Sequence, residues 1–135
     1  MHVRIAALAD FASASEGSKI NILGIFTDIY ANSVPVTHPQ MYLVFVLEFD
    51  SSEAGDKNIK IDLVDEDGRD MLSVNGEMHI ERSPAGHPTR MNQIVNLTGM
   101  IFPKYGAYEF RIVIDGKTEA IVDLNVREIP SPVGR

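Results

Sequence analysis

The sequence predicts an all-β domain of two packed sheets, and three observations support this prediction. Apolar and polar residues alternate through residues 108–114 and again through 120–126, which is the two-residue period of a half-buried strand. Between these segments lies Asp115-Gly116, a dipeptide typical of a two-residue hairpin turn because it tolerates positive φ. Segments of the same kind recur along the chain without a convincing helical stretch, which indicates a sandwich or small barrel of about eight strands.

The first half of the chain is predicted to supply three strands. Residues 2–11 alternate, and their frequent small side chains indicate tight packing or a sheet edge. A loop over 12–18 leads to a longer strand over 19–30, whose apolar residues change parity near Gly24. A glycine at such a change predicts a β-bulge. Prolines within residues 32–40 predict a loop that crosses from one sheet to another, which favours two packed sheets over a barrel.

The strand predicted over residues 41–49 is apolar on both faces. A strand with one face exposed to solvent would instead alternate apolar and polar residues. Its second row consists of Tyr42, Val44 and Val46. Two explanations remain open, since either the chain covers this row itself or another subunit does. If the row is uncovered, these three residues form an interaction patch, because exposed apolar patches mark contact sites.

The second half is predicted to supply the remaining strands, over residues 58–64, 71–80, 90–97, 108–114 and 120–126. Polar turns separate them at residues 65–69 and 83–88. The resulting domain covers residues 1–128. Residues 129–135 contain two prolines and a glycine and are predicted to form a flexible tail.

The segment from Phe102 to Phe110, followed by Ile114-Asp115-Gly116, resembles the closing strands of an immunoglobulin-like sandwich. In that class a tyrosine near the start of the penultimate strand often bonds to backbone a few residues upstream, and Tyr108 matches this position. The resemblance implies a single immunoglobulin-like antiparallel β-sandwich. Cysteine and tryptophan are absent, so kinship with antibody domains is not implied.

Nearly the whole chain also resembles a family of small, uncharacterised bacterial proteins. The matching segments are residues 6–10, 19–26 and 61–68. This resemblance implies a β-sandwich in a bacterial or phage-derived cytoplasm. It brings no activity and no functional residue with it.

Composition limits the partners and compartments that we expect. The net charge of −7 argues against nucleic acid and against an anionic membrane surface, which both attract basic proteins. The chain has no cysteine, which excludes disulfides and thiol chemistry and favours the cytoplasm. No segment before Asp10 reads as a signal peptide, and no apolar run is long enough to span a bilayer.

The clearest candidate for a chemical site is the acidic turn over residues 65–70, which contains Asp65, Asp67 and Asp70. Carboxylates around a glycine can bind calcium, but the longer ligand series of a full calcium loop is missing. His79 lies in alternation with Glu77 and Glu81, which indicates a solvated polar face. We predict no catalytic residue and no cofactor.

These observations lead to an expected function. We expect a non-catalytic interaction or assembly module, with a second copy or another protein as its partner. The alternative is a module that binds a carbohydrate or calcium through three loops at one end of the sandwich, over residues 12–18, 65–70 and 83–88. Whether the acidic turn binds a cation stays open at this point.

Overall fold

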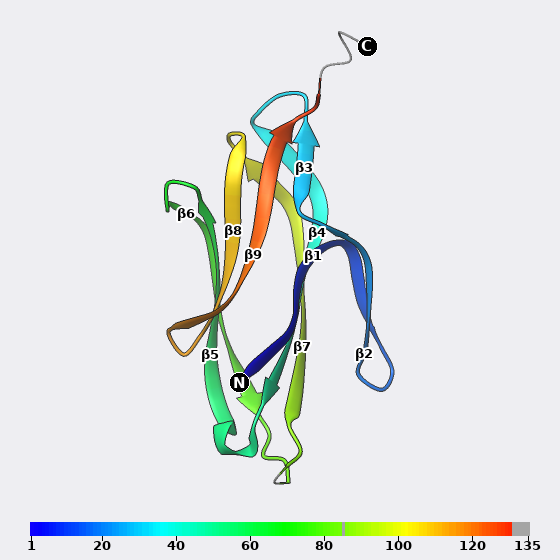
Figure 1. Ribbon diagram of the computed structural model, residues 1–135, viewed down its shortest axis with the longest axis vertical. Coiled ribbons are helices and arrows are strands. Elements are labelled where there is room, and N and C mark those ends of the chain that lie inside the picture. Colours follow the sequence, from blue (N-terminus) through cyan, green and yellow to red (C-terminus); the bar gives the residue numbers. More distant parts are fainter. Residues whose placement is uncertain (85, 131–135) are drawn as a thin grey trace.

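The computed structural model shows an all-β protein of two facing sheets, and it describes residues 1–84 and 86–130. Sheet A has the strand order β2-β1-β4-β7, and sheet B has the order β3-β9-β8-β5-β6 (Figure 1). Residues 131–135, most of the predicted tail, lie outside the described range. The strands are β1 (His2–Ser15), β2 (Lys19–Phe26), β3 (Asp28–Ala31), β4 (Val36–Phe49), β5 (Gly55–Asp65), β6 (Asp70–Ile80), β7 (Thr89–Phe102), β8 (Gly106–Ile114) and β9 (Lys117–Glu128).

The described residues therefore form nine strands, where the sequence predicted about eight. The additional strand arises because the predicted strand over 19–30 divides at Thr27. β2 pairs with β1 in sheet A, whereas β3 pairs with β9 in sheet B. The β3–β9 pair is parallel, and the other strand pairs are antiparallel.

Several strand boundaries also differ from the prediction, most of all in β1, β4 and β7, where β7 continues to Phe102 past its predicted end at residue 97. β1 continues to Ser15 through most of the predicted loop over 12–18. β4 begins at Val36, inside the predicted crossing loop, and its pairing with β7 passes over Pro39. Proline has no N–H to donate to a strand ladder, and the strand tolerates it by omitting that one bond.

The core lies between the sheets and is closed by large side chains from both. Phe45 and Phe49 come from sheet A and Phe110 from sheet B, and all three are fully buried. The inward row of β4 alternates as a strand period requires, with Leu43, Phe45 and Leu47 in the same core cluster. Burial of such side chains stabilises a domain by about 1.5–3 kcal/mol each.

The β8–β9 hairpin closes sheet B with a two-residue turn. Asp115 and Gly116 have φ of 47° and 83°, and the residues that flank them, Ile114 and Lys117, are cross-strand partners. At the other end of β8 the Tyr108 hydroxyl donates to the carbonyl of Lys104 at 2.6 Å. This bond is the backbone contact that a tyrosine corner makes.

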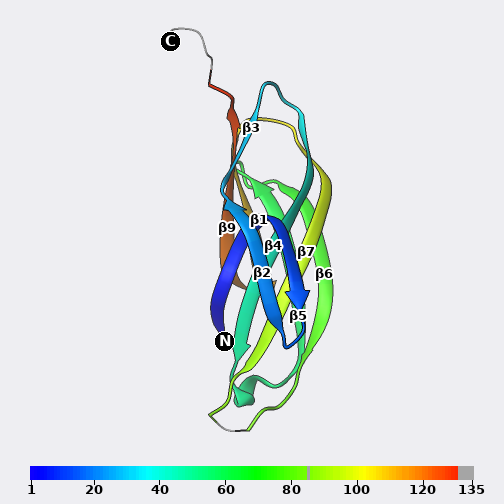
Figure 2. The ribbon, with the colours of Figure 1, turned by 90° about the vertical axis from the view of Figure 1, so that its right-hand side faces the viewer.

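β1 and β2 form a hairpin that folds back over sheet A. β1 pairs with β4 only as far as Ala9, opposite Tyr42, and its remaining residues pair with β2 alone. Figure 2 shows this hairpin lying in front of β4 and β7, on the side of sheet A away from sheet B. We call residues 10–26 the flap.

The bend of the flap lies at Gly24, which has φ of +73°, in the left-handed region that favours glycine. The β1–β2 register continues across this position without a shift, with Ala9 opposite Ile25 and Phe11 opposite Leu23. The predicted β-bulge is therefore wrong, and the change of facing comes from a bend. A Cβ atom at Gly24 would come within 2.5 Å of the Asp10 carboxylate.

We predict that Phe110→Ala lowers the free energy of unfolding by about 3–5 kcal/mol, because it leaves a cavity at a fully buried site. Urea denaturation followed by circular dichroism measures this change. Ile121→Ala is the matched control in sheet B, because Ile121 is 54% exposed and its truncation should cost under about 0.5 kcal/mol. Equal losses in the two variants would contradict the assignment of Phe110 to the core.

Candidate functional site

The outer face of sheet A, which points away from sheet B, is apolar and lies under the flap. The strand register places three cross-strand rows on this face, each with one residue from β1, β4 and β7. These rows are Ala9–Tyr42–Asn96, Ala7–Val44–Ile94 and Ile5–Val46–Asn92. The predicted interaction patch thus forms the middle column of the outer face.

The side chains of that patch are covered within the chain. Val44 is 0% exposed and Val46 is 4% exposed, although neither belongs to the core cluster between the sheets. Tyr42 is half-buried. Of the two explanations left open by the sequence, the structure thus favours cover by the chain itself. Contact of a partner with these three residues would require the flap to move away.

The tip of the flap reaches across the sheet. Asn92 in β7 donates its Nδ2 hydrogen to the carbonyl of Ser18 at 2.9 Å. Because β4 and β1 separate β7 from β2 in the sheet order, the flap must cross over both strands to make this bond. The ring of Phe11 adds an edge-on contact with Tyr42, with a centroid distance of 5.6 Å.

The small side chains of β1 make room for the flap. Ala9 on the outer face is fully buried, and Ala12 in the flap is 5% exposed. Methyl side chains at these positions let the flap approach the sheet closely. The sequence predicted tight packing or an edge for this segment, and its alanines lie in a tightly packed place.

The flap also carries apolar side chains that are largely exposed. Phe11, Leu23 and Ile25 are 48%, 69% and 64% exposed, respectively. Phe11 and Leu23 are direct cross-strand partners, and Ile25 lies two residues further along β2. We call these three residues the flap patch. β2 is also the end strand of sheet A, so its outer edge has no neighbouring strand among the described residues.

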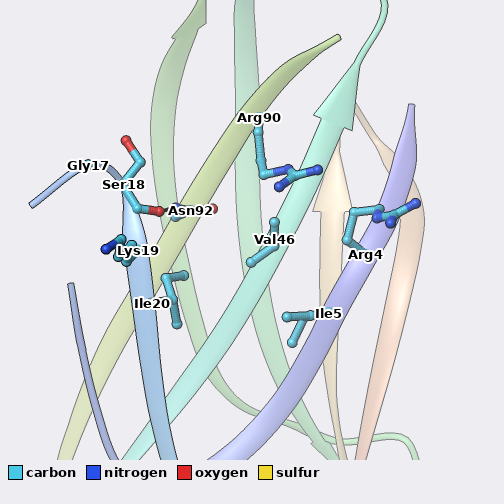
Figure 3. Close-up of a pocket in the computed structure, with 9 residues that line it drawn as sticks. All are labelled: Arg4, Ile5, Gly17, Ser18, Lys19, Ile20, Val46, Arg90 and Asn92. Carbon is cyan, nitrogen blue, oxygen red and sulfur yellow. Dashed lines mark hydrogen bonds between the residues drawn. The ribbon is translucent and has the colours of Figure 1, made fainter. Parts of the chain in front are cut away.

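A groove of about 600 Å³ lies beside the flap tip, between the tip and the strands of sheet A. Figure 3 shows Arg4 from β1 and Arg90 from β7 on one side of Val46, with Ser18 and Lys19 of the flap tip on the other side. The apolar part of the lining comes from Ile5, Ile20 and Val46.

Glu48 holds the two arginines of this groove. Its carboxylate lies 2.6 Å from Arg90 Nη2 and 3.7 Å from Arg4 Nε. The hydrogen bond from Arg90 keeps the pKa of Glu48 below its usual value of 4.5. Glu48 is therefore ionised at neutral pH and orients both guanidinium groups.

The acidic turn does not form a cation site in the described part of the chain. Asp65 Oδ1 accepts hydrogen bonds from the backbone N–H groups of Asp67 and Arg69, both at 2.9 Å. Asp67 pairs with Lys104 at 2.7 Å, and this bond holds the pKa of Asp67 below its usual value. No group of three or more metal-ligating side chains occurs among the described residues.

The three loops of the ligand-binding alternative do not share one end of the sandwich. β5 runs for 11 residues from Gly55 to Asp65, which separates its ends by about 35 Å. The turn over 65–70 lies at the Asp65 end, whereas Gly86–Pro88 lie at the other end, beside Asp50 (Figure 1). The flap tip lies over sheet A. The prediction of a common end is therefore wrong, because the single strand β6 carries the chain from the turn over 65–70 to the opposite end of the sandwich.

His79 forms an exposed ion pair with Asp56, and their Nδ1 and Oδ1 atoms are 2.7 Å apart. Asp56 lies directly opposite His79 in the β5–β6 register. The hydrogen bond that the His79 ring donates to the Asp56 carboxylate raises the pKa of His79 above its ordinary value of 6.5. The contact is a surface pair and includes no nucleophile.

Sequence reasoning missed the flap patch and the groove. The signal available for the flap patch was the change at Gly24 in which face of the strand carries the apolar residues. After such a change, Leu23 and Ile25 cannot both belong to the buried face of one strand. Arg4, Lys19 and Arg90 gave no local signal, since they are far apart in the sequence and meet only when the flap folds back.

The model of a family of unknown function, DUF6941, matches residues 4–127. The chain belongs to DUF6941. The match covers the whole flap and all three rows of the outer face of sheet A. No curated protein matches this DUF6941 member.

Among solved structures, this DUF6941 chain is similar to Pseudomonas fluorescens alkylpurine DNA glycosylase AlkC bound to DNA containing an abasic site analog. The TM-score is 0.43 and the identity 11%, over 93% of this chain and 30% of the glycosylase chain. The prediction that excluded nucleic acid is corrected by this finding, because a structural neighbour is bound to DNA. A likeness of this size does not assign DNA binding to the DUF6941 chain. No helix among the described residues is long and apolar enough to cross a membrane.

We predict that Val44→Asp lowers the free energy of unfolding by about 3 kcal/mol or more, because it places a carboxylate without a partner beneath the flap. Urea denaturation measures the loss. Val74→Asp is the matched control, since Val74 is 43% exposed on β6. If Val44→Asp were as stable as the control, the flap would not cover this face in solution.

We predict that His79 titrates above pH 6.5 and that Asp56→Asn lowers its pKa more than Glu81→Gln does. Asp56 makes the main hydrogen bond, whereas Glu81 acts mainly through its charge. Since the folded-state pKa is raised, the stabilisation is complete at low pH and is lost as the pH rises through that pKa. NMR titration of the His79 ring protons measures all three values, and an unchanged midpoint in Asp56→Asn would contradict the pairing.

Proposed function

We propose that this DUF6941 chain is a non-catalytic interaction module that associates with a second copy of itself through the flap patch. The observation behind this proposal is the exposure of three adjoining apolar side chains on the flap, Phe11 in β1 and its neighbours Leu23 and Ile25 in the end strand β2. Exposed apolar side chains that adjoin one another mark contact sites, whereas isolated ones are ordinary.

The chemistry of the flap patch favours a second copy as the partner. The three side chains carry no charge, and the charged side chain of β2, Lys19, stands at its start. An apolar patch is complementary to itself, and a two-fold axis places the same patch on both partners. Antiparallel pairing of two β2 edges centred on Gly24 would set Leu23 of one copy opposite Ile25 of the other. Such pairing would also satisfy the open edge of the strand.

The charge of the chain makes this association depend on salt. Each copy carries a net charge of −7, so two copies repel one another at low ionic strength. Salt screens that repulsion over about 10 Å at 0.1 M and also strengthens apolar contacts. A patch of three side chains is small against a standard interface, so we expect a weak dimer whose fraction rises with protein concentration.

The proposal also includes the finer fold class and the setting. The bond between Tyr108 and the Lys104 carbonyl supports an immunoglobulin-like sandwich. The absence of cysteine supports a cytoplasmic setting, and the sequence resemblance to bacterial proteins supports a bacterial one.

We predict that Leu23→Lys and Ile25→Lys shift the chain to a monomer, each weakening dimerisation by about tenfold or more, because each places a like charge on both sides of the two-fold contact. Sedimentation equilibrium at several protein concentrations measures the dissociation constant. Ile121→Lys is the matched control, because Ile121 is similarly exposed but lies in sheet B. A wild-type chain that stays monomeric at millimolar concentration would overturn the proposal. Equal weakening by the control would also overturn it.

A further inference from the structure

The groove beside the flap tip has a lining whose charge differs from that of the protein as a whole. Arg4, Lys19 and Arg90 line it, and no acidic side chain of residues 1–84 or 86–130 does. The whole chain carries 19 acidic and 12 basic side chains, whereas these three cations outnumber the one carboxylate that pairs with two of them, Glu48, which is a local reversal of sign. Such a reversal in a concave surface attracts anions.

Glu48 gives this cationic lining a fixed geometry. It pairs with Arg4 and Arg90 from outside the lining, and its own side chain is only 16% exposed. Both contacts of Arg90 to Glu48 use Nε and Nη2, which leaves Nη1 free to donate. The arginines are 51% and 58% exposed, so their free N–H groups are accessible to a ligand.

The remaining lining adds an apolar surface and an acceptor. Ile5 and Ile20 give a ligand an apolar surface beside the charges, whereas Val46 lies beneath them and is 4% exposed. The Oδ1 atom of Asn92 is buried and has no hydrogen-bond partner among the described residues, although its Nδ2 is held by Ser18. A buried acceptor without a donor is costly, but this one has almost no accessible surface, so a ligand N–H or O–H group reaches it only if the Asn92 side chain turns toward the groove.

We propose that this groove binds a small organic anion, with a phosphate or carboxylate group on Arg4 and Arg90 and an apolar body on Ile5 and Ile20. Arginine guanidinium groups recognise both kinds of anion through charge-assisted hydrogen bonds. The volume of about 600 Å³ lies in the usual range of small-molecule sites, about 300–1,000 Å³. The groove is built by the underside and tip of the flap, so it is distinct from the flap patch.

Titration of the ¹⁵N-labelled chain with phenyl phosphate, followed by NMR, tests this site. We expect saturable shifts of the Ser18, Lys19 and Asn92 resonances and an affinity that falls as salt rises. Phenylacetate replaces the phosphate by a carboxylate and shows which anion is preferred. Inorganic phosphate lacks the apolar body and phenol lacks the strong anion, so both should bind at least about tenfold more weakly.

Variants assign the binding to the groove. Arg4→Gln and Arg90→Gln should each weaken phenyl phosphate binding about tenfold, the loss expected for one charge-assisted hydrogen bond. Arg111→Gln is the matched control, because Arg111 also pairs with a glutamate but lies in sheet B. Preserved circular dichroism spectra show that the variants are folded.

Three results would overturn the proposal. The first is the absence of saturable shifts for both phenyl phosphate and phenylacetate. The second is equal weakening by Arg111→Gln and by the two groove variants. The third is arginine-dependent binding of a single-stranded thymidine oligonucleotide without binding of either small anion, which would assign the groove to a nucleic-acid backbone instead.

Discussion

The apolar character of both faces of β4 is the constraint on which the rest of the structure depends. One face supplies Leu43, Phe45 and Leu47 to the core between the sheets. The other presents Tyr42, Val44 and Val46, and a second layer must cover them because exposing two valines to water costs about 1.5–3 kcal/mol each. The chain meets this need locally by folding the β1–β2 hairpin over sheet A. The molecule is thus two layers thick over most of its area and three layers thick above β4.

This cover explains features that otherwise look unrelated. The alanines of β1 are small because the flap lies directly above them. β1 is longer than the sheet requires because its second half belongs to the flap. The bond between Asn92 and Ser18 fixes the tip at the far side of β4. The apolar residues that do not fit beneath the flap, Leu23 and Ile25, are left on its exposed side.

Much of the fold could be predicted from the sequence because its signals are local. The alternation around Asp115-Gly116 is a property of a few neighbouring residues, and the two apolar rows of β4 can be read directly. The direction of the flap could not be predicted, since it depends on contacts between residues more than 70 positions apart. The same limit applies to the candidate site. The apolar row of β4 is apparent in the sequence. The flap that covers this row, and the arginines that lie beside Val46, become its neighbours only when the β1–β2 hairpin folds over sheet A.

Gly24 limits which substitutions the flap can tolerate. Its left-handed backbone and its closeness to Asp10 mean that the turn of the flap depends on the absence of a side chain at one position. Any L-residue with a Cβ would meet both the backbone strain and the carboxylate, and a straightened hairpin would relieve both. Such a hairpin would extend β1 and β2 beyond sheet A with apolar side chains exposed, and it would leave Val44 and Val46 exposed to water. The third layer of this protein therefore depends on glycine at position 24, where every other residue would carry a Cβ atom.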